Sequence, residues 1–304
     1  MTLREMYSAY NEAGVGGFSK KTPVISFEIF PPKNDDDGSK LEKLLKHLDI
    51  LKKYRPAFIS LTYGAGGTTQ TNSWEIIERI RQDLGLKIMP HFTCVGSSKE
   101  QVQQYLKEIQ DLGIRNILAL RGDLPEGIDS LDCDFKYANE LVDFIKLKTD
   151  LSIGVAGYPE CHIDCEDLSL DIKNLKRKID AGADAIYTQM FFDNDKLFKF
   201  FELAKAAGIE APIIPGILPI MNYKQFEKML SMARVSVPKH LMNQLEKYKD
   251  NPEDTKKVGI EFASLQCQQL IESDVAGLHF FTLNTSSALC PILDNLGLLE
   301  KASR

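Results

Sequence analysis

No apolar run in the sequence is long enough to span a bilayer, which excludes a transmembrane protein. The N-terminal segment contains acidic residues and lacks a continuous apolar core, so we expect neither a secretory signal nor a transit peptide. Acidic residues outnumber basic ones, 43 to 37, and a net charge of −6 provides no cationic surface for nucleic acid. We therefore expect a cytoplasmic protein that binds a small ligand, with no nucleic acid and no membrane as partner.

The sequence also has few cysteines. No spacing among the six repeats as a disulfide framework or a paired zinc knuckle would, so we interpret them as reduced thiols. Cys161, His162 and Cys165 lie close together, but no second pair of ligands has a matching spacing, and we expect no metal site. A Gly/Ser-rich linker and a compositional break are absent too, which predicts a single domain over residues 1–304.

What the sequence does contain is a series of short, β-rich apolar runs. They extend over Val24–Phe30, Ala57–Thr62, Lys87–Thr93, Asn116–Leu120, Ser152–Ala156, Asp184–Gln189, Ala211–Leu218 and Leu278–Leu283. Segments with helical spacing of apolar residues separate them, at Leu41–Leu51, Ser73–Leu84, Glu100–Leu112, Lys136–Leu147, Leu168–Ile179 and Lys196–Ala207. Apolar strands between helices are typical of a covered parallel sheet, and eight such units close a barrel. We predict an α/β fold of the (β/α)8 or TIM-barrel class.

Local signals agree with this assignment. Ser98 is placed to cap the helix that begins at Lys99, and Gly113, Gly182 and Gly208 stand where helices end. The connection after the seventh strand is longer, with a helix near residues 223–232, a polar stretch and a long helix to residue 273. The sequence thus predicts extra helices between strands 7 and 8.

Polar residues at the ends of the apolar runs are the candidates for an active site, because barrel enzymes place it at the carboxyl ends of their strands. Glu28 lies between Phe27 and Ile29, so its carboxyl group faces either the barrel interior or a ligand pocket. Burial there is expected to raise its pKa toward neutrality and make it a usable general acid. A structural ion pair is the alternative, and the same two interpretations apply to Asp123 beside Arg121.

Two further features stay open at this point. The glycine-rich segment 64–69 matches no established phosphate-binding motif, and it either supplies backbone amides at a turn or is a flexible loop. His91 is either a histidine of the barrel core or a ring that contacts a cofactor.

Several strand ends taken together resemble methylenetetrahydrofolate reductase of the bacterial type, catalytic domain only. The segments that carry the resemblance are SFEIFPPK, ISLTYGAGGTT, HFTCVG, GIRNILALRGDLP, YPECH, LKRKIDAGADAIYTQMFFD, IIPGILPI and HFFTLN. They extend in order from about residue 23 to the C-terminal helix. The resemblance leads us to expect no appended regulatory domain and no control by adenosylmethionine.

The resemblance implies a noncovalent FAD across the top of the barrel. By motif position, its contacts are Thr62, Tyr63, Ala65, His91, Arg121, Gly122, Asp123, Tyr137, Ala138, Tyr158, His162, Asp171, Asn174 and Lys178. A cationic lysine with nearby amides suits a pyrophosphate.

The implied reaction is ping-pong reduction of methylenetetrahydrofolate to methyltetrahydrofolate, with NADH or NADPH reducing the flavin in the same pocket. Glu28 is implied to be the acid that assists opening of the folate imidazolidine ring. Asp123 is implied to be a second catalytic residue near flavin and pterin, where it tunes the flavin potential and orients the substrate. Thr62, Asp123, Gln189 and Gln225 are implied to bind substrate. A homo-oligomer is also expected, since the family often forms one.

Three positions depart from the family pattern. Phe281 stands where a tyrosine is usual, Met190 replaces an aromatic residue, and Thr285 stands where an arginine commonly follows TLN. Loss of that guanidinium bears on how the distal end of the folate is held and on which electron donor is used.

Two alternatives remain. An aldolase or lyase without flavin needs a lysine at a strand end for a Schiff base, and none of the eight strands ends in one. The second alternative is a folate-reducing subunit that takes electrons from a partner flavoprotein or iron-sulfur protein instead of NADH. A test of NADH as reductant separates that alternative from the reductase.

Overall fold

The computed structural model describes residues 1–12, 22–33, 35, 37–62, 70–123, 133–231 and 233–298. Its elements are α1 (Leu3–Glu12), β1 (Val24–Ile29), α2 (Ser39–Lys52), β2 (Phe58–Leu61), α3 (Gln70–Leu84), β3 (Ile88–Thr93), α4 (Lys99–Asp111), β4 (Asn116–Leu120), α5 (Ala138–Lys148), β5 (Ser152–Gly157), α6 (Leu168–Asp180), β6 (Ala185–Met190), α7 (Asn194–Ala206), β7 (Ile213–Ile217), α8 (Tyr223–Leu230), α9 (Lys239–Lys247), α10 (Pro252–Glu272), β8 (Gly277–Phe281) and α11 (Leu289–Asn295).

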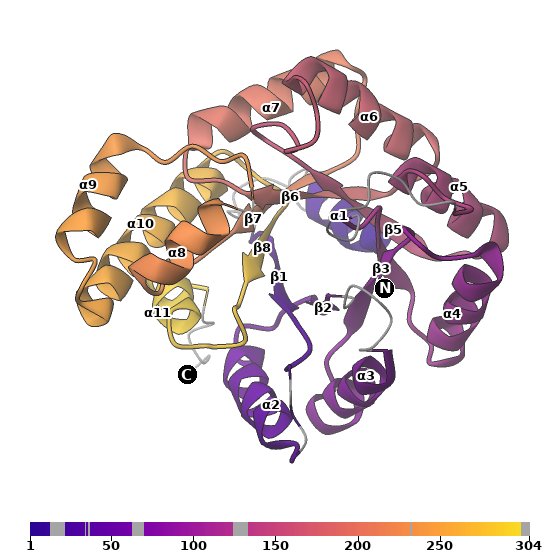
Figure 1. Ribbon diagram of the computed structural model, residues 1–304, viewed down its shortest axis with the longest axis horizontal. Helices are drawn as coiled ribbons and strands as arrows, with labels where there is room; N and C mark the ends of the chain where they lie inside the picture. Colours follow the sequence, from indigo (N-terminus) through magenta and orange to yellow (C-terminus); the bar gives the residue numbers. More distant parts are fainter. Residues whose placement is uncertain are drawn as a thin grey trace.

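The strands form a closed parallel barrel in the order β1 to β8, and β8 pairs with β1 to complete it. Figure 1 shows the helices from α2 onward arranged around the outside of the barrel, whereas α1 lies within this ring, across the barrel. The predicted (β/α)8 barrel is therefore confirmed, whereas the single-domain organisation stays a prediction. No helix in the described part of the chain combines the length and apolar character that crossing a bilayer requires.

Alternation along β1 decides which way Glu28 faces. Ile25, Phe27 and Ile29 belong to the large apolar core that also holds the buried residues of the surrounding helices. Side chains along a strand alternate between its faces, so Ser26 and Glu28 point into the barrel. The interior orientation of Glu28 follows from this pattern.

Helix α1 closes the amino end of the barrel. Leu3, Met6 and Tyr7 pack with interior residues of the strands, and the Tyr7 and Tyr187 hydroxyl groups lie 3.1 Å apart. The Leu3 N–H donates to Asn116 Oδ1 at 2.8 Å at the start of β4. This end of the barrel is filled, so its carboxyl end is the one available for a ligand.

The connection from β7 to β8 contains α8, α9 and α10, as predicted, and they group on one side of the barrel in Figure 1. Phe226, Leu241 and Leu245 are buried in a small core beside β7. Helix α10 approaches so closely that a Cβ at Gly259 would lie 2.1 Å from the Ile220 carbonyl oxygen, which explains a glycine inside a helix.

The predicted helix boundaries are also found. Ser98 caps α4 in a capping box with Gln101, whose backbone N–H donates to the serine hydroxyl oxygen at 3.3 Å. Gly113, Gly182 and Gly208 follow α4, α6 and α7 with φ of 69°, 111° and 73°, values that glycine adopts without steric cost.

Candidate active site

Glu28 lies one residue before the end of β1, on the interior face and near the carboxyl end of the barrel. Its strand neighbours in register are Ser60 on β2 and Phe281 on β8. The side chain keeps 20% of its surface exposed, so it forms part of the open end of the barrel.

Two histidines from other strands converge on one oxygen of this carboxylate. Nε2 of His91, on β3, lies 3.6 Å from Glu28 Oε2, and Nε2 of His279, on β8, lies 3.5 Å from the same atom. His279 Nδ1 lies 2.7 Å from Ser26 Oγ, and its Nε2 lies 3.4 Å from Ser60 Oγ. The side chains of these five residues make up a polar layer inside the barrel, which we call the acid layer.

The direction of the Glu28 pKa differs from our prediction. Burial raises the pKa, but the interaction with His279 and the proximity of His91 and His279 together hold it below its ordinary value. The prediction from burial alone was wrong because the histidines, which lie far from Glu28 in sequence, stabilise the charged carboxylate. Burial lowers the pKa of His91 to about 4, so this ring is neutral near neutral pH.

The backbone of Glu28 is held by the TLN segment that follows β8. Thr282 donates to the Glu28 carbonyl oxygen from its hydroxyl at 2.7 Å and from its N–H at 3.1 Å. Asn284 Oδ1 accepts a hydrogen bond from the Phe30 N–H at 3.1 Å, and Asn284 Nδ2 donates one to the Phe30 carbonyl oxygen at 2.7 Å. Leu283 and Asn284 have positive φ of 50° and 57°, a turn that brings the asparagine back onto β1.

Five of the residues that the resemblance assigns to FAD lie in one network at the ends of β4 and β5. Arg121 Nη1 lies 3.5 Å from Asp164 Oδ2, beside His162. The rings of His162 and Tyr158 meet edge to face at 4.5 Å, and Lys178 Nζ lies 5.9 Å from the Tyr158 ring centroid. The fifth residue, Asp171, accepts the His162 backbone N–H at 2.9 Å. The network joins residues that are 57 positions apart in the chain, from 121 to 178.

Two charged groups of this network, Lys178 and Asp171, have shifted pKa values. Lys178 is partly buried, and burial lowers its pKa to about 8 although Asp171 acts in the opposite direction. Its Nζ donates to the Ala156 carbonyl at 2.6 Å. Burial also raises the pKa of Asp171. The charged form of Lys178 is destabilised by burial. A phosphate group bound next to it would stabilise that charge.

Gln189 is placed by an irregularity in β6. The pairing of β6 with β7 shifts register between Tyr187 and Met190, as in a β-bulge that redirects a side chain. Thr188 Oγ1 accepts the Gly216 N–H at 2.9 Å, and a Cβ at residue 216 would lie 2.2 Å from the Thr188 carbonyl oxygen. Gln189 Oε1 accepts the Met190 N–H at 2.9 Å, and among the described residues no hydrogen bond engages its amide NH2.

The remaining predicted residues lie around these groups with fewer contacts. The Thr62 N–H donates to the carbonyl oxygen of Ile29, the residue after Glu28, at 3.0 Å. Gln225 is the third residue of α8, and the N-cap residue Asn222 donates to its Oε1 at 3.1 Å. Asn174 Oδ1 accepts from Arg177 at 2.9 Å on α6. These residues come from separate elements and contribute no bond to the acid layer.

Asp123 is exposed beyond β4, next to Gly122, and its charge adds to the burial that raises the pKa of Tyr158. Tyr137, 59% exposed, caps α5 with Ala138 as the first helical residue. Tyr63 and Ala65 lie outside the described residues.

Our interpretation of the strand ends missed His279, Ser26 and Ser60. All three are buried and lie deeper in the barrel than the strand ends. A signal was present, because each is a polar residue in an otherwise apolar strand, and Ser26 shares a face with Glu28. The neighbourhood of Ser26 and His279 appears only when β8 closes onto β1.

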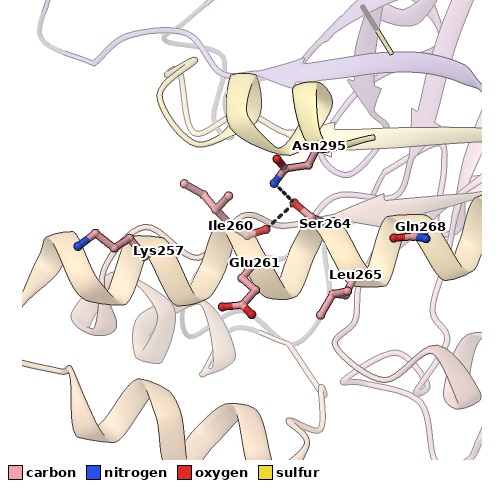
Figure 2. Close-up of a pocket in the computed structure, with 7 residues that line it drawn as sticks. All are labelled: Lys257, Ile260, Glu261, Ser264, Leu265, Gln268 and Asn295. Carbon is pink, nitrogen blue, oxygen red and sulfur yellow. Dashed lines mark hydrogen bonds between the residues drawn. The ribbon is translucent and has the colours of Figure 1, made fainter. Parts of the chain in front are cut away.

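A cavity of about 490 Å³ lies elsewhere, on the outer side of α10 against the end of α11. Figure 2 shows its lining, in which Asn295 donates to Ser264 Oγ at 3.0 Å and Ser264 donates to the Ile260 carbonyl at 2.7 Å. Lys257, one of its charged groups, is paired with Asp254 at 2.8 Å. Within the described ranges, no group of three or more His, Cys, Asp or Glu residues could hold a metal ion.

A closed parallel barrel with polar side chains at the carboxyl ends of its strands defines a (β/α)8-barrel enzyme. Residues 17–297 match the family model described as methylenetetrahydrofolate reductase. The chain is 38% identical to 5,10-methylenetetrahydrofolate reductase of Pectobacterium carotovorum, with 92% of each chain covered, and 37% identical to that of Escherichia coli, with 90% of each covered. The chain belongs to the methylenetetrahydrofolate reductase family.

Two further comparisons add context. The chain is 40% identical to methylenetetrahydrofolate reductase (NADH) 1 of Arabidopsis thaliana over 92% of its own length, and it spans about half of that relative, 49%. A solved structure from Clostridium thermocellum, described as an uncharacterized protein that binds two copies of 5-methyl-5,6,7,8-tetrahydrofolic acid, has a TM-score of 0.62 at 16% identity. It covers 92% of this chain and 95% of its own, and this likeness shows the fold alone.

Proposed function

We propose that this protein reduces 5,10-methylenetetrahydrofolate to 5-methyltetrahydrofolate with FAD as its cofactor. The observation that carries the proposal is Glu28 at the open end of the barrel, with two imidazole rings on one of its oxygens. Family membership and near-complete coverage of two bacterial reductases support the same activity. The Clostridium thermocellum protein of similar fold is described as binding a folate, which agrees with this substrate class.

The described residues fit a flavin that carries phosphate groups. Lys178 and Arg121 supply positive charge at the ends of β4 and β5, and Tyr158 supplies an aromatic surface beside Lys178. Within the described residues His91 Nε2 is buried without a hydrogen-bond partner, so a polar ligand atom would satisfy it. When bound, FAD supplies hydride transfer between the nicotinamide nucleotide and the folate.

Glu28 is the group that we assign to proton donation. Near neutral pH it is a carboxylate in the chain on its own, because its pKa lies below the ordinary value. A flat ligand over its exposed surface removes water, which disfavours the charged form and raises the pKa. Binding of the folate thus brings the carboxyl group towards the protonated form in which it serves as an acid.

Other residues of the site orient the substrate. The amide NH2 of Gln189, which has no hydrogen-bond partner among the described residues, is a donor for the pterin, and Thr62 is held against Ile29, the residue after Glu28. We include Asp123 and Gln225 in the same site, with Asp123 near both the flavin and the pterin. NADH or NADPH is the proposed reductant, and it uses the same pocket in a separate half-reaction.

Anaerobic visible spectra of the FAD-reconstituted protein test this proposal. Bleaching of the flavin band by NADH or NADPH, followed by its recovery on addition of methylenetetrahydrofolate, is the expected result. If the flavin is reduced only by a chemical reductant and its band then recovers with the folate, the electron donor would be a partner redox protein and not the nicotinamide nucleotide. Failure to bind FAD, or no recovery with the folate, would overturn the assignment.

A further inference from the structure

Two cysteines lie close together in the loop that joins β5 to α6, and the proposed reaction gives neither of them a role. Cys161 and Cys165 are both free thiols. The Cys161 thiol donates to the Cys165 carbonyl oxygen at 3.7 Å, and the Cys165 thiol donates to the Asp167 carbonyl oxygen at 3.5 Å. A hydrogen bond between the two thiols also contributes to the raised pKa of Cys161, so the sulfur atoms are neighbours.

Two successive turns of the backbone bring these thiols together. The Cys161 N–H donates to the Tyr158 carbonyl oxygen at 3.2 Å, and the Cys165 N–H donates to the His162 carbonyl oxygen at 3.0 Å. Cys161 has a φ of 78°, which a residue with a Cβ adopts at a cost in free energy. A disulfide bond needs Cα atoms about 4–7 Å apart, a separation that the ends of a tight turn provide.

The segment between α8 and α9 holds this loop from outside. Arg234 Nη1 donates to the Cys165 carbonyl oxygen at 3.1 Å, and its Nη2 donates to the Ile163 carbonyl oxygen at 3.2 Å. The Glu160 carboxylate accepts the Ser236 N–H at 3.1 Å and also the serine hydroxyl. These bonds fix the backbone on both sides of the turn, so the two thiols stay near each other.

The surroundings give the two thiols different reactivity. Cys161 is only 6% exposed, and burial raises its pKa to about 11, so a solute oxidant reacts with it slowly. Cys165 is half-buried, and part of its surface is open to such a solute. In an oxidation of this pair, Cys165 is therefore the first to react and Cys161 is the thiol that resolves the product.

We propose that Cys161 and Cys165 form a disulfide bond when the protein meets a peroxide, and that this bond tightens the binding of FAD. In the first step the Cys165 thiolate attacks hydrogen peroxide, and the O–O bond breaks. The sulfur becomes a sulfenic acid, and the leaving hydroxide takes up the proton of the former thiol to form water. In the second step the Cys161 sulfur attacks the Cys165 sulfur, the S–O bond breaks, and a second water leaves with the Cys161 proton. The two thiols lose two electrons in total, and the peroxide gains them.

The ring that the disulfide closes contains part of the network at the ends of β4 and β5. The His162 ring meets the Tyr158 ring at 4.5 Å, and Asp164 lies 3.5 Å from Arg121. A disulfide restricts the conformations of the segment between its cysteines, and a preorganised site binds its ligand more tightly. Tighter FAD binding rests on the proposed function, in which this network holds the flavin. Formation of the disulfide depends only on the polypeptide.

Peptide mass mapping of the full chain without FAD tests the disulfide. After treatment with hydrogen peroxide, the peptide that contains both cysteines should be lighter by two hydrogens, and a thiol reductant should restore its mass. Cys161→Gly removes the resolving thiol and suits the positive φ of this position, so the turn should be kept. In that variant Cys165 should stop at the sulfenic acid, which dimedone traps. Cys290→Ser, a change at a half-buried cysteine in α11, is the control and should form the disulfide as the parent does. Unchanged thiols, or a sulfenic acid that persists in the parent protein, would overturn the proposal.

Titration with FAD after removal of the peroxide tests the second part. We expect the oxidised parent protein to bind FAD about 3- to 10-fold more tightly than the reduced parent, with the gain reversed by a thiol reductant. Oxidised and reduced Cys161→Gly should bind FAD equally. Equal affinity in both forms of the parent, or the same change in Cys161→Gly, would overturn the effect on FAD. A protein that forms the disulfide but binds no FAD would overturn the proposed function and leave the disulfide site supported.

Discussion

The carbonyl oxygen of Glu28 accepts two hydrogen bonds from Thr282, one from the hydroxyl at 2.7 Å and one from the N–H at 3.1 Å. Asn284 continues this attachment by pairing with both backbone groups of Phe30. The last strand of the barrel thus holds the first strand at the residue that carries the acid. The proposed active site and the closure of the barrel depend on the same bonds.

Thr282→Val removes the hydroxyl bond and keeps the shape of the side chain. We expect a loss of about 1 kcal/mol in the free energy of unfolding, typical of a buried hydrogen bond. Reoxidation of reduced flavin by folate should slow several-fold while FAD affinity stays unchanged. Urea unfolding and stopped-flow spectra measure the two effects. Thr149→Val, which removes a similar 2.9 Å bond to the Ile145 carbonyl after α5, should lower stability without slowing the reaction.

Glu28→Gln should separate the two half-reactions. The amide keeps the size of the side chain but cannot give up a proton, and a general acid contributes about 10²- to 10⁴-fold to a rate. We expect a loss of that order in reoxidation by methylenetetrahydrofolate, with FAD binding and reduction by NADH retained. Glu261→Gln, on the outer face of α10 in Figure 2, is the matched control. Equal loss in both half-reactions would show that residue 28 acts on the flavin instead.

The barrel could be predicted because its signals are local. Apolar runs between amphipathic helices, Ser98 before α4 and the glycines after the helices depend on neighbours in the chain. The proximity of Arg121 and Tyr158 could be anticipated because strand ends in a parallel barrel meet at one end, whereas Lys178, on α6, was expected only from the family resemblance.

The acid layer could not be predicted, because it depends on register. Ser26 and His279 are 253 residues apart and meet only where β8 closes onto β1. For the same reason the sequence suggested the wrong direction for the Glu28 pKa: burial is visible in an apolar strand, but two imidazoles from distant strands are not. The direction of the Gln189 side chain depends on the register shift between β6 and β7, and the residues of β6 give no local signal for that shift.

His91 should make the protein sensitive to acid. Burial lowers its pKa to about 4 in the folded chain, while an unfolded histidine titrates near 6.5. Between these values the unfolded state binds more protons, so the free energy of unfolding falls as pH falls, by up to about 1.4 kcal/mol per pH unit from this residue.

Urea unfolding at about pH 7 and about pH 5 measures this dependence. From the higher to the lower pH, His91→Gln should lose less free energy of unfolding than the parent protein. Part of the pH dependence should remain, because the pKa of Glu28 is also lowered in the folded state. His240→Gln, an exposed histidine changed in the same way, should behave like the parent protein. An unaltered slope in His91→Gln would mean that His91 is protonated in the folded state at about pH 5.

Lys178 should stabilise the complex with FAD and destabilise the protein without it. Its pKa is lowered to about 8 by burial, from 10.5 in an unfolded chain, so below about pH 8 the folded state holds a charge that burial disfavours. Lys178→Met keeps the apolar stem beside Tyr158 and removes that charge.

Without FAD, the free energy of unfolding of this variant should rise by about 1–2 kcal/mol near neutral pH. This value is smaller than the full pKa shift implies, because the side chain is only partly buried. Its FAD affinity should fall about 10- to 100-fold through loss of a charge-assisted bond to phosphate. Thermal unfolding with and without FAD measures both effects, and a variant that is less stable without FAD would show that the Nζ bond to Ala156 outweighs the cost of burial.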